Sequence, residues 1–180
     1  MASKLPTSPE EIQTVMVETD VLVIGGGNSG CFAAIEAKKQ NARLKVTIME
    51  KAHIDRSGCL AAGMDAINTY IKKGRTIEEF VRWSRSQAGG LIREDLTKTL
   101  AEVLNQPTEE WERWGLPIKH DEETDEYVTR GKWDITIRGS EMKVILAEKV
   151  REFGVEVLNR VVATGYLMDG ERVIGAMGFG

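Results

Sequence analysis

Three closely spaced glycines constrain the fold of this chain more than any other feature. Gly25, Gly27 and Gly30 follow an apolar, β-branched run at 19–24 and open a stretch at 28–40 with small and apolar residues on one side. The run predicts a buried strand, and the stretch predicts a helix. In such a turn the first glycine permits the sharp bend, the second lets the backbone approach a pyrophosphate, and the third lets the helix pack closely on the sheet. The pattern therefore predicts a dinucleotide-binding turn.

An acidic residue stands where such a turn needs one. A second apolar run at 44–49 closes with Glu50, twenty positions after Gly30. A carboxylate at this point accepts hydrogen bonds from an adenosine ribose, and the helix N-terminus offers free N–H groups to phosphate. The motif alone leaves NAD(P) and FAD open, and the alternative to both is a glycine-rich turn that binds nothing.

The remaining sequence predicts helices, a returning strand and a hairpin. Residues 53–63 are rich in small residues without a sustained period, which predicts a loop with close backbone approaches. Apolar periodicity and capping residues predict helices at 76–83, 93–104, 108–115 and 140–153. Pro107 is expected to end the second of these helices. The acidic residues at 121–126 predict a solvated loop. A strand follows at 155–158. Asp169-Gly170 then predicts a hairpin between the runs 160–168 and 172–179.

Composition argues against several classes of protein. Hydrophobic residues make up 42% of the chain and charged residues 29%, which is typical of a soluble globular domain. Because 24 basic residues face 28 acidic ones, for a net charge of -4, nucleic acid is not an expected partner. No apolar run reaches the length of about 18 residues that direct membrane insertion needs. Cys31 and Cys59 lack metal-site spacing, so we expect free thiols, no metal and a cytoplasmic location.

Several blocks after Glu50 resemble one superfamily of flavoproteins and separate FAD from NAD(P). The segment 56–63 (RSGCLAAG) is similar to the flavin-contacting loop of the fumarate reductase/succinate dehydrogenase flavoproteins. Within that superfamily the chain most resembles the α subunits of the adenylylsulfate reductases. Further similar blocks follow in the same order as in that family, at 66–70, 81–82, 91–96, 114–117 and 131–133.

The resemblance implies FAD as the cofactor and assigns residues to its parts. The pyrophosphate would be held by Gly25, Gly27, Asn28, Ser29 and Gly30, and the adenosine side by Glu50 and Lys51. The ribityl chain and isoalloxazine edge would contact Arg56, Ser57, Gly58, Ala61 and Gly63. Members with covalent flavin carry a histidine just after the Arg-Ser pair. This chain has Gly58 there, so noncovalent FAD is expected.

The resemblance also implies a fold and a division of the chain. The fold would be an α/β, glutathione-reductase-type (Rossmann-like) FAD-binding domain built from 18–70 and 140–180. A polar tail would precede it at 1–17, and a helical insertion would interrupt it at 71–139. The family continues into a capping domain that brings a catalytic arginine and histidine. We therefore expect residues beyond Gly180 to complete the flavin sheet and the catalytic machinery.

The function implied by the resemblance is reduction of adenylylsulfate to AMP and sulfite, with electrons from an iron–sulfur partner protein. One alternative keeps the enzyme class and changes the small-molecule substrate to a dicarboxylate or another activated alkene, as in fumarate reductases. A second alternative belongs to another class: a flavin-binding fragment or carrier without catalysis.

Single residues offer both functional and structural interpretations. Arg56 and Asn68 are the candidate catalytic residues, although Asn68 could equally stabilise a turn. Tyr70 and Trp133 could flank a substrate adenine, but aromatic residues at such spacing are more often core. Cys59 could be a redox thiol, and a small buried hydrophobe is the simpler interpretation. The histidines His53 and His120 show no carboxylate partner at a recognisable spacing.

Overall fold

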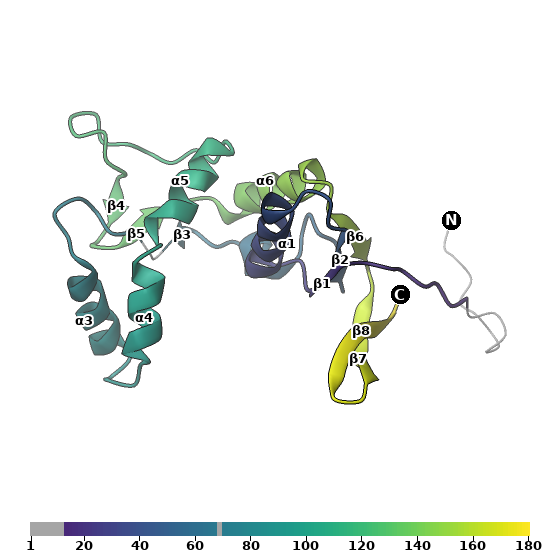
Figure 1. Cartoon of the computed structure of the whole chain (residues 1–180). Coiled ribbons are helices and arrows are strands. Elements are labelled where there is room, and N and C mark those ends of the chain that lie inside the picture. Colours follow the sequence, from purple (N-terminus) through teal and green to yellow (C-terminus); the bar gives the residue numbers. More distant parts are fainter. Residues whose placement is uncertain (1–12, 68–69) are drawn as a thin grey trace.

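The computed structural model describes residues 13–67 and 70–180 (Figure 1). A parallel sheet with the strand order β1-β2-β6 lies at the centre of the described chain. Its strands are β1 (Val21–Ile24), β2 (Val46–Glu50) and β6 (Glu156–Asn159), and α1 (Asn28–Gln40) connects the first two. This confirms the predicted βαβ unit and places helix α1 at the predicted residues. Every residue of β2 is buried, as a central strand requires.

Helix α6 (Gly139–Glu152) packs beside α1, and the two helices share the main hydrophobic core with the sheet (Figure 1). Cys31 and Ile35 of α1 and Leu146 of α6 are fully buried in this core. The helix predicted at 140–153 is therefore confirmed within one residue at each end. Gly154 follows it with a φ of 68°, the left-handed conformation that ends many helices.

The loop predicted at 53–63 contains a short helix, α2 (Gly58–Ala61). The prediction of a loop without regular structure is therefore wrong at these residues. The sequence could not show it, because one helical turn is too short to display a 3.6-residue period. Gly58 and Gly63 take φ angles of 81° and 107°, which agrees with the expected close backbone approaches.

The residues between the two halves of the sheet hold helices and a small antiparallel sheet. The helices are α3 (Ile77–Gln87), α4 (Glu94–Ala101) and α5 (Asn105–Arg113). The sheet has the strand order β3-β5-β4, with β3 (Ala66–Ile67), β4 (Thr129–Arg130) and β5 (Asp134–Thr136). Strands this short leave no clear alternation, so the sequence predicts only a helical segment here. A small separate cluster of Phe80, Ala101, Leu104 and Trp133 lies in this region, and other buried residues of the region, such as Trp111 and Ile135, belong to the main core.

Pro107 lies inside α5 and does not separate two helices. The predicted break at this residue is wrong because Pro107 occupies the third position of α5. In the first turn of a helix the missing N–H of proline removes no intrahelical hydrogen bond, so proline is tolerated there.

An aromatic cluster fastens α5 to α1. The ring of Phe32 stacks on Trp114 with centroids 5.3 Å apart and meets Trp111 edge-on at 5.4 Å. Lys39 lies over the Trp114 ring at 5.6 Å and pairs with Glu110 of α5. The small sheet with its helices is thereby attached to the parallel-sheet half of the chain.

The predicted hairpin is present as β7 (Val162–Asp169) and β8 (Arg172–Phe179) (Figure 1). Gly170 takes the left-handed φ of 60° that such a turn requires. The hairpin extends away from the parallel sheet, and most of its residues are exposed. Among the helices of the described residues, none combines the length and the apolar character that crossing a bilayer would require.

Candidate functional site

The glycine turn, residues 25–30, has the geometry that its spacing predicts. Gly25 takes a φ of 99° and donates its N–H to the carbonyl of Met49 at 2.8 Å. A Cβ at Gly30 would lie 1.9 Å from the carbonyl oxygen of Gly25, so only glycine fits there. A Cβ at Gly27 would meet no atom of the described residues within 4 Å. The turn therefore packs tightly on its inner side and faces open space on its outer side.

The N-terminus of α1 borders that open space. Gly27 is the N-cap residue, and in the described part of the chain no side chain caps the helix there and no acidic residue stands in its first turn. Asn28 and Ser29 are exposed, and the backbone bond from Cys31 N to the Gly27 carbonyl, 3.0 Å, begins the helix. The first N–H groups of α1 are thus free to bind an anion, and the helix dipole favours one.

Glu50 lies directly behind the glycine turn. Its side chain is buried, with 3% exposure, and its Oε2 accepts the N–H of Gly26 at 2.5 Å. The other carboxylate oxygen accepts the N–H of Ala52 at 2.7 Å. These bonds fix the carboxylate at the end of β2. Each carboxylate oxygen keeps a second lone pair that can accept another hydrogen bond. The expected contacts of Glu50 and of the exposed Lys51 with adenosine stay predictions.

The carbonyl of Gly26 points to the inner side of the turn and accepts hydrogen bonds from several side chains. The hydroxyl of Ser57 donates to it at 3.0 Å, the thiol of Cys31 at 3.3 Å, and the buried ammonium of Lys143 donates as well. Burial raises the pKa of the Cys31 thiol, and the nearby charge of Lys143 only partly opposes this. Cys31 therefore stays a thiol that can donate.

Lys143 is not among the residues predicted for the site, although the sequence contains a usable signal. Buried positions of α6 recur at 139, 142, 143, 146, 147 and 150, which is the period of one helix face. A lysine on that apolar face is unusual, because lysine is almost never fully buried without a partner. Lys143 has 0% exposure.

The segment predicted to contact flavin divides between two places. Ser57 and Gly58 lie against the glycine turn, since a Cβ at Gly58 would be 3.3 Å from the Cα of Gly27. Arg56 and Ala61 instead line a cavity of about 430 Å³ beside α6, together with Asp55, Ser140, Val144, Glu148 and Arg151. The structure thus brings Ser57 and Gly58 to the turn and places Arg56 and Ala61 at a neighbouring cavity.

A second, more apolar cavity of about 400 Å³ opens beside Asn28. Its lining includes Leu60 of α2 and Met142 of α6. Ile67 of β3 and Leu104, just before α5, also line it. An apolar cavity next to the free N–H groups of α1 suits a ligand that joins a phosphate to an aromatic ring. Asn68, a candidate catalytic residue, lies outside the described residues.

The aromatic and cysteine candidates have structural surroundings. Trp133 is 2% exposed and meets Phe80 edge-on at 5.4 Å, and Tyr70 packs edge-on against Tyr127 at 4.8 Å. Trp133 is a core residue and Tyr70 packs, partly buried, against the core, which agrees with the simpler interpretation. Cys59 is exposed, so the expectation of a small buried hydrophobe is wrong at this position. Its place at the start of the unpredicted helix α2 explains the difference.

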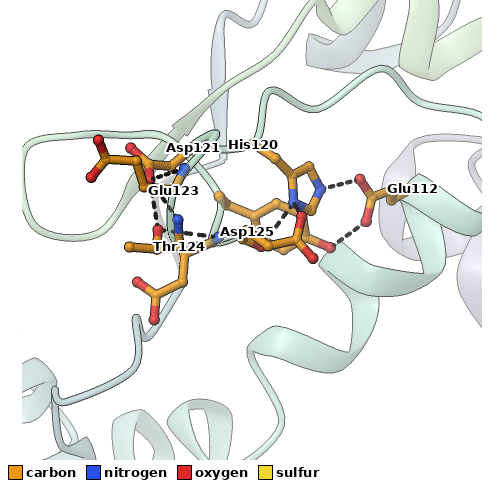
Figure 2. Close-up of polar contacts among 8 residues, drawn as sticks. Glu112, His120, Asp121, Glu123, Thr124 and Asp125 are labelled. Atoms are coloured by element: carbon orange, nitrogen blue, oxygen red, sulfur yellow. Dashed lines mark hydrogen bonds and ion pairs between the residues drawn. The ribbon is translucent and has the colours of Figure 1, made fainter.

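A cluster of polar side chains from residues 112–127 surrounds His120 (Figure 2). Its Nε2 lies 2.5 Å from Glu112 and its Nδ1 lies 3.0 Å from the carbonyl oxygen of Asp125, while Glu112 also accepts the hydroxyl of Tyr127 at 2.7 Å. The expectation that His120 lacks a carboxylate partner is wrong, because a turn of α5 and the bend at 121–126 bring these residues together. The hydrogen bond to the Asp125 carbonyl raises the pKa of His120 most, and the hydrogen bond to Glu112 raises it further.

A parallel βαβ unit with an open glycine turn and an uncapped helix defines a nucleotide-binding protein. The sequence model of a family described as "FAD binding domain" matches residues 20–179. The chain therefore belongs to the FAD-binding domain family, whose cofactor is FAD.

Relatives with known names support the same placement. The chain is 32% identical to the alpha subunit of adenylylsulfate reductase from Megalodesulfovibrio gigas, across 93% of this chain and 29% of that protein. It is 26% identical to a fumarate reductase (CoM/CoB) polypeptide of Methanothermobacter marburgensis, across 93% and 32%. The solved adenylylsulfate reductase of Archaeoglobus fulgidus aligns with a TM-score of 0.83 and 40% identity, covering 94% of this chain and 28% of that one. The chain spans less than a third of the length of each of these proteins.

Proposed function

We propose that this chain is the FAD-binding part of a flavin-dependent oxidoreductase that reduces adenylylsulfate to AMP and sulfite. The observation that carries this is the likeness to adenylylsulfate reductases along nearly the whole chain, at 32% and 40% identity, against 26% for the fumarate reductase. The domain is of the glutathione-reductase type, with residues 18–70 and 140–180 around the insertion at 71–139.

The residues of the turn suit noncovalent FAD. The free N–H groups of α1 and the open face of Gly27 would bind the pyrophosphate, with Asn28 and Ser29 beside it. Glu50 and Lys51 would bind the adenosine side. Gly58 stands where covalent members have a histidine, and glycine has no side chain that could bond to the flavin. The flavin supplies the electron chemistry, and the protein supplies binding and orientation.

The proposal includes a partner and a location. Electrons would come from an iron–sulfur protein, and both cysteines of this chain are free thiols, which suits the cytoplasm. Arg56 and Asn68 are proposed to act near the substrate, with further catalytic groups supplied outside these residues.

The choice of substrate is tested by turnover of the whole protein that contains this chain. Dye-linked assays with adenylylsulfate and with fumarate, at matched concentrations, should show catalysis with adenylylsulfate only. Turnover of fumarate alone would assign the protein to the fumarate reductases. Tight FAD binding without turnover of either compound would favour a flavin carrier.

A further inference from the structure

Gly26 lies between two buried charged side chains. Its N–H donates to the carboxylate of Glu50, and its carbonyl accepts from the ammonium of Lys143. Both side chains are nearly inaccessible, at 3% and 0% exposure. Burying a charge is costly unless hydrogen bonds and opposite charge compensate it. An arrangement of this cost around a single residue calls for an explanation.

The ammonium of Lys143 is incompletely compensated. Among the described residues it contacts the Gly26 carbonyl and, at 3.8 Å, the sulfur of Cys31, and no carboxylate lies within 4.0 Å. Its direct partners on the inner side are therefore two neutral acceptors, and the carboxylate of Glu50 lies beyond them, on the N–H of Gly26. An anion on the outer side of the turn would supply the missing negative charge across the thickness of one peptide group.

The orientation of the Gly26–Gly27 peptide group also favours an anion on the outer side of the turn. No cis peptide bond occurs in the described residues, and in a trans peptide the C=O and the following N–H point in opposite directions. Because Lys143, Ser57 and Cys31 hold the Gly26 carbonyl inward, the N–H of Gly27 is directed outward. A Cβ at Gly27 would also meet no described atom within 4 Å, so the space around this residue is open.

We propose that Lys143 is a positioning residue of the FAD site. It holds the Gly26–Gly27 peptide so that the Gly27 N–H faces the pyrophosphate, and its charge balances the phosphate charge through that peptide. This inference rests on the proposed FAD site. It adds a residue that comes from α6, more than a hundred positions after the glycine turn.

The test uses the whole protein that contains this chain and compares FAD affinity in Lys143→Met and Lys143→Gln with that of the unsubstituted protein. Methionine is unbranched and one atom shorter than lysine, and it has neither donor nor charge, whereas glutamine keeps a donor. Hydrogen bonds to charged groups contribute about 1.5–3 kcal/mol, so Lys143→Met should weaken FAD binding about ten- to a hundredfold. Lys143→Gln should fall between, because it restores the orientation and not the charge. Lys149→Met, on the same helix where lysine pairs with Glu152, is the matched control and should leave affinity unchanged.

Two further readouts separate this role from simple packing. ADP carries the pyrophosphate without the flavin, so its affinity should fall by a similar factor. Thermal unfolding of the FAD-free Lys143→Met protein should change little, because Ser57 and Cys31 still donate to the Gly26 carbonyl and keep it satisfied. A packing residue would show the reverse: lower stability and unchanged ADP affinity.

The outcomes are distinct. If folded Lys143→Met binds FAD within about twofold of the unsubstituted chain, the inference is overturned while the FAD site stands. If Lys143→Met does not fold, Lys143→Gln decides, and unchanged affinity for FAD and ADP there overturns the proposal. If the whole protein that contains this chain binds no FAD without any substitution, the proposed function itself fails.

Discussion

The glycine turn and the His120 cluster organise polar groups in different ways. At the turn, residues 25–30 present backbone N–H groups to open space, and buried side chains from α1, β2 and α6 hold the backbone from behind. At the His120 cluster, the half-exposed side chains of His120 and Glu112 and the buried Tyr127 bond one another within the segment between β3 and α6. The turn therefore keeps its outer N–H groups for a ligand from outside. The cluster satisfies its own groups and stabilises a bend.

The largest expected effect is on stability, from Gly30→Ala. Alanine usually stabilises a helix by about 1 kcal/mol relative to glycine. Here its Cβ would lie 1.9 Å from the Gly25 carbonyl oxygen. We therefore expect the free energy of unfolding to fall by about 3 kcal/mol or more. Urea denaturation measures this, and a stabilised variant would show that the turn is not tightly packed.

Gly27→Val sharpens the contrast within the turn. A Cβ there meets no described atom, and the φ of -72° and ψ of -174° suit valine, so the fold should persist. The branched side chain would fill the space proposed for the pyrophosphate, and FAD affinity should fall more than about a hundredfold, or 2.8 kcal/mol. FAD titration of the folded variant tests this. Undiminished affinity would mean that the turn is only structural.

In the insertion, Thr76→Ala should change stability and not FAD affinity. Thr76 and Glu79 form a capping box at the start of α3, and losing such a cap costs about 1 kcal/mol. Chemical denaturation and FAD titration of the same sample measure both quantities. Altered FAD affinity would break the separation between the two regions.

The smallest effect concerns pH. The folded-state pKa of His120 is raised above its ordinary 6.5, so its bonds contribute stability that is fully present below about pH 6.5. This contribution is lost as the pH rises through the folded-state pKa. His120→Asn should therefore flatten the decline of the melting temperature above pH 6.5. An unchanged profile in the variant would show that His120 does not titrate this way.

The sequence predicted the parts of the site that depend on backbone. The glycine spacing, the helix at 28–40 and the strand that ends in Glu50 follow from local rules of sterics and periodicity. Lys143 was missed because its contact with Gly26 joins residues 117 positions apart in the sequence. The partners of His120 lie only five and eight positions away, but a bend brings them together and a bend has no periodic pattern. Short elements such as α2 and β4 also escaped, since they contain too few residues to show a period.

The central claim, that this chain holds FAD noncovalently at the glycine turn, is tested most directly by acid precipitation of the purified, yellow protein. The account predicts that the flavin stays in the supernatant and that chromatography identifies it as FAD. Flavin that pellets with the protein would contradict noncovalent binding. A nicotinamide dinucleotide in place of FAD would contradict the assignment of the cofactor.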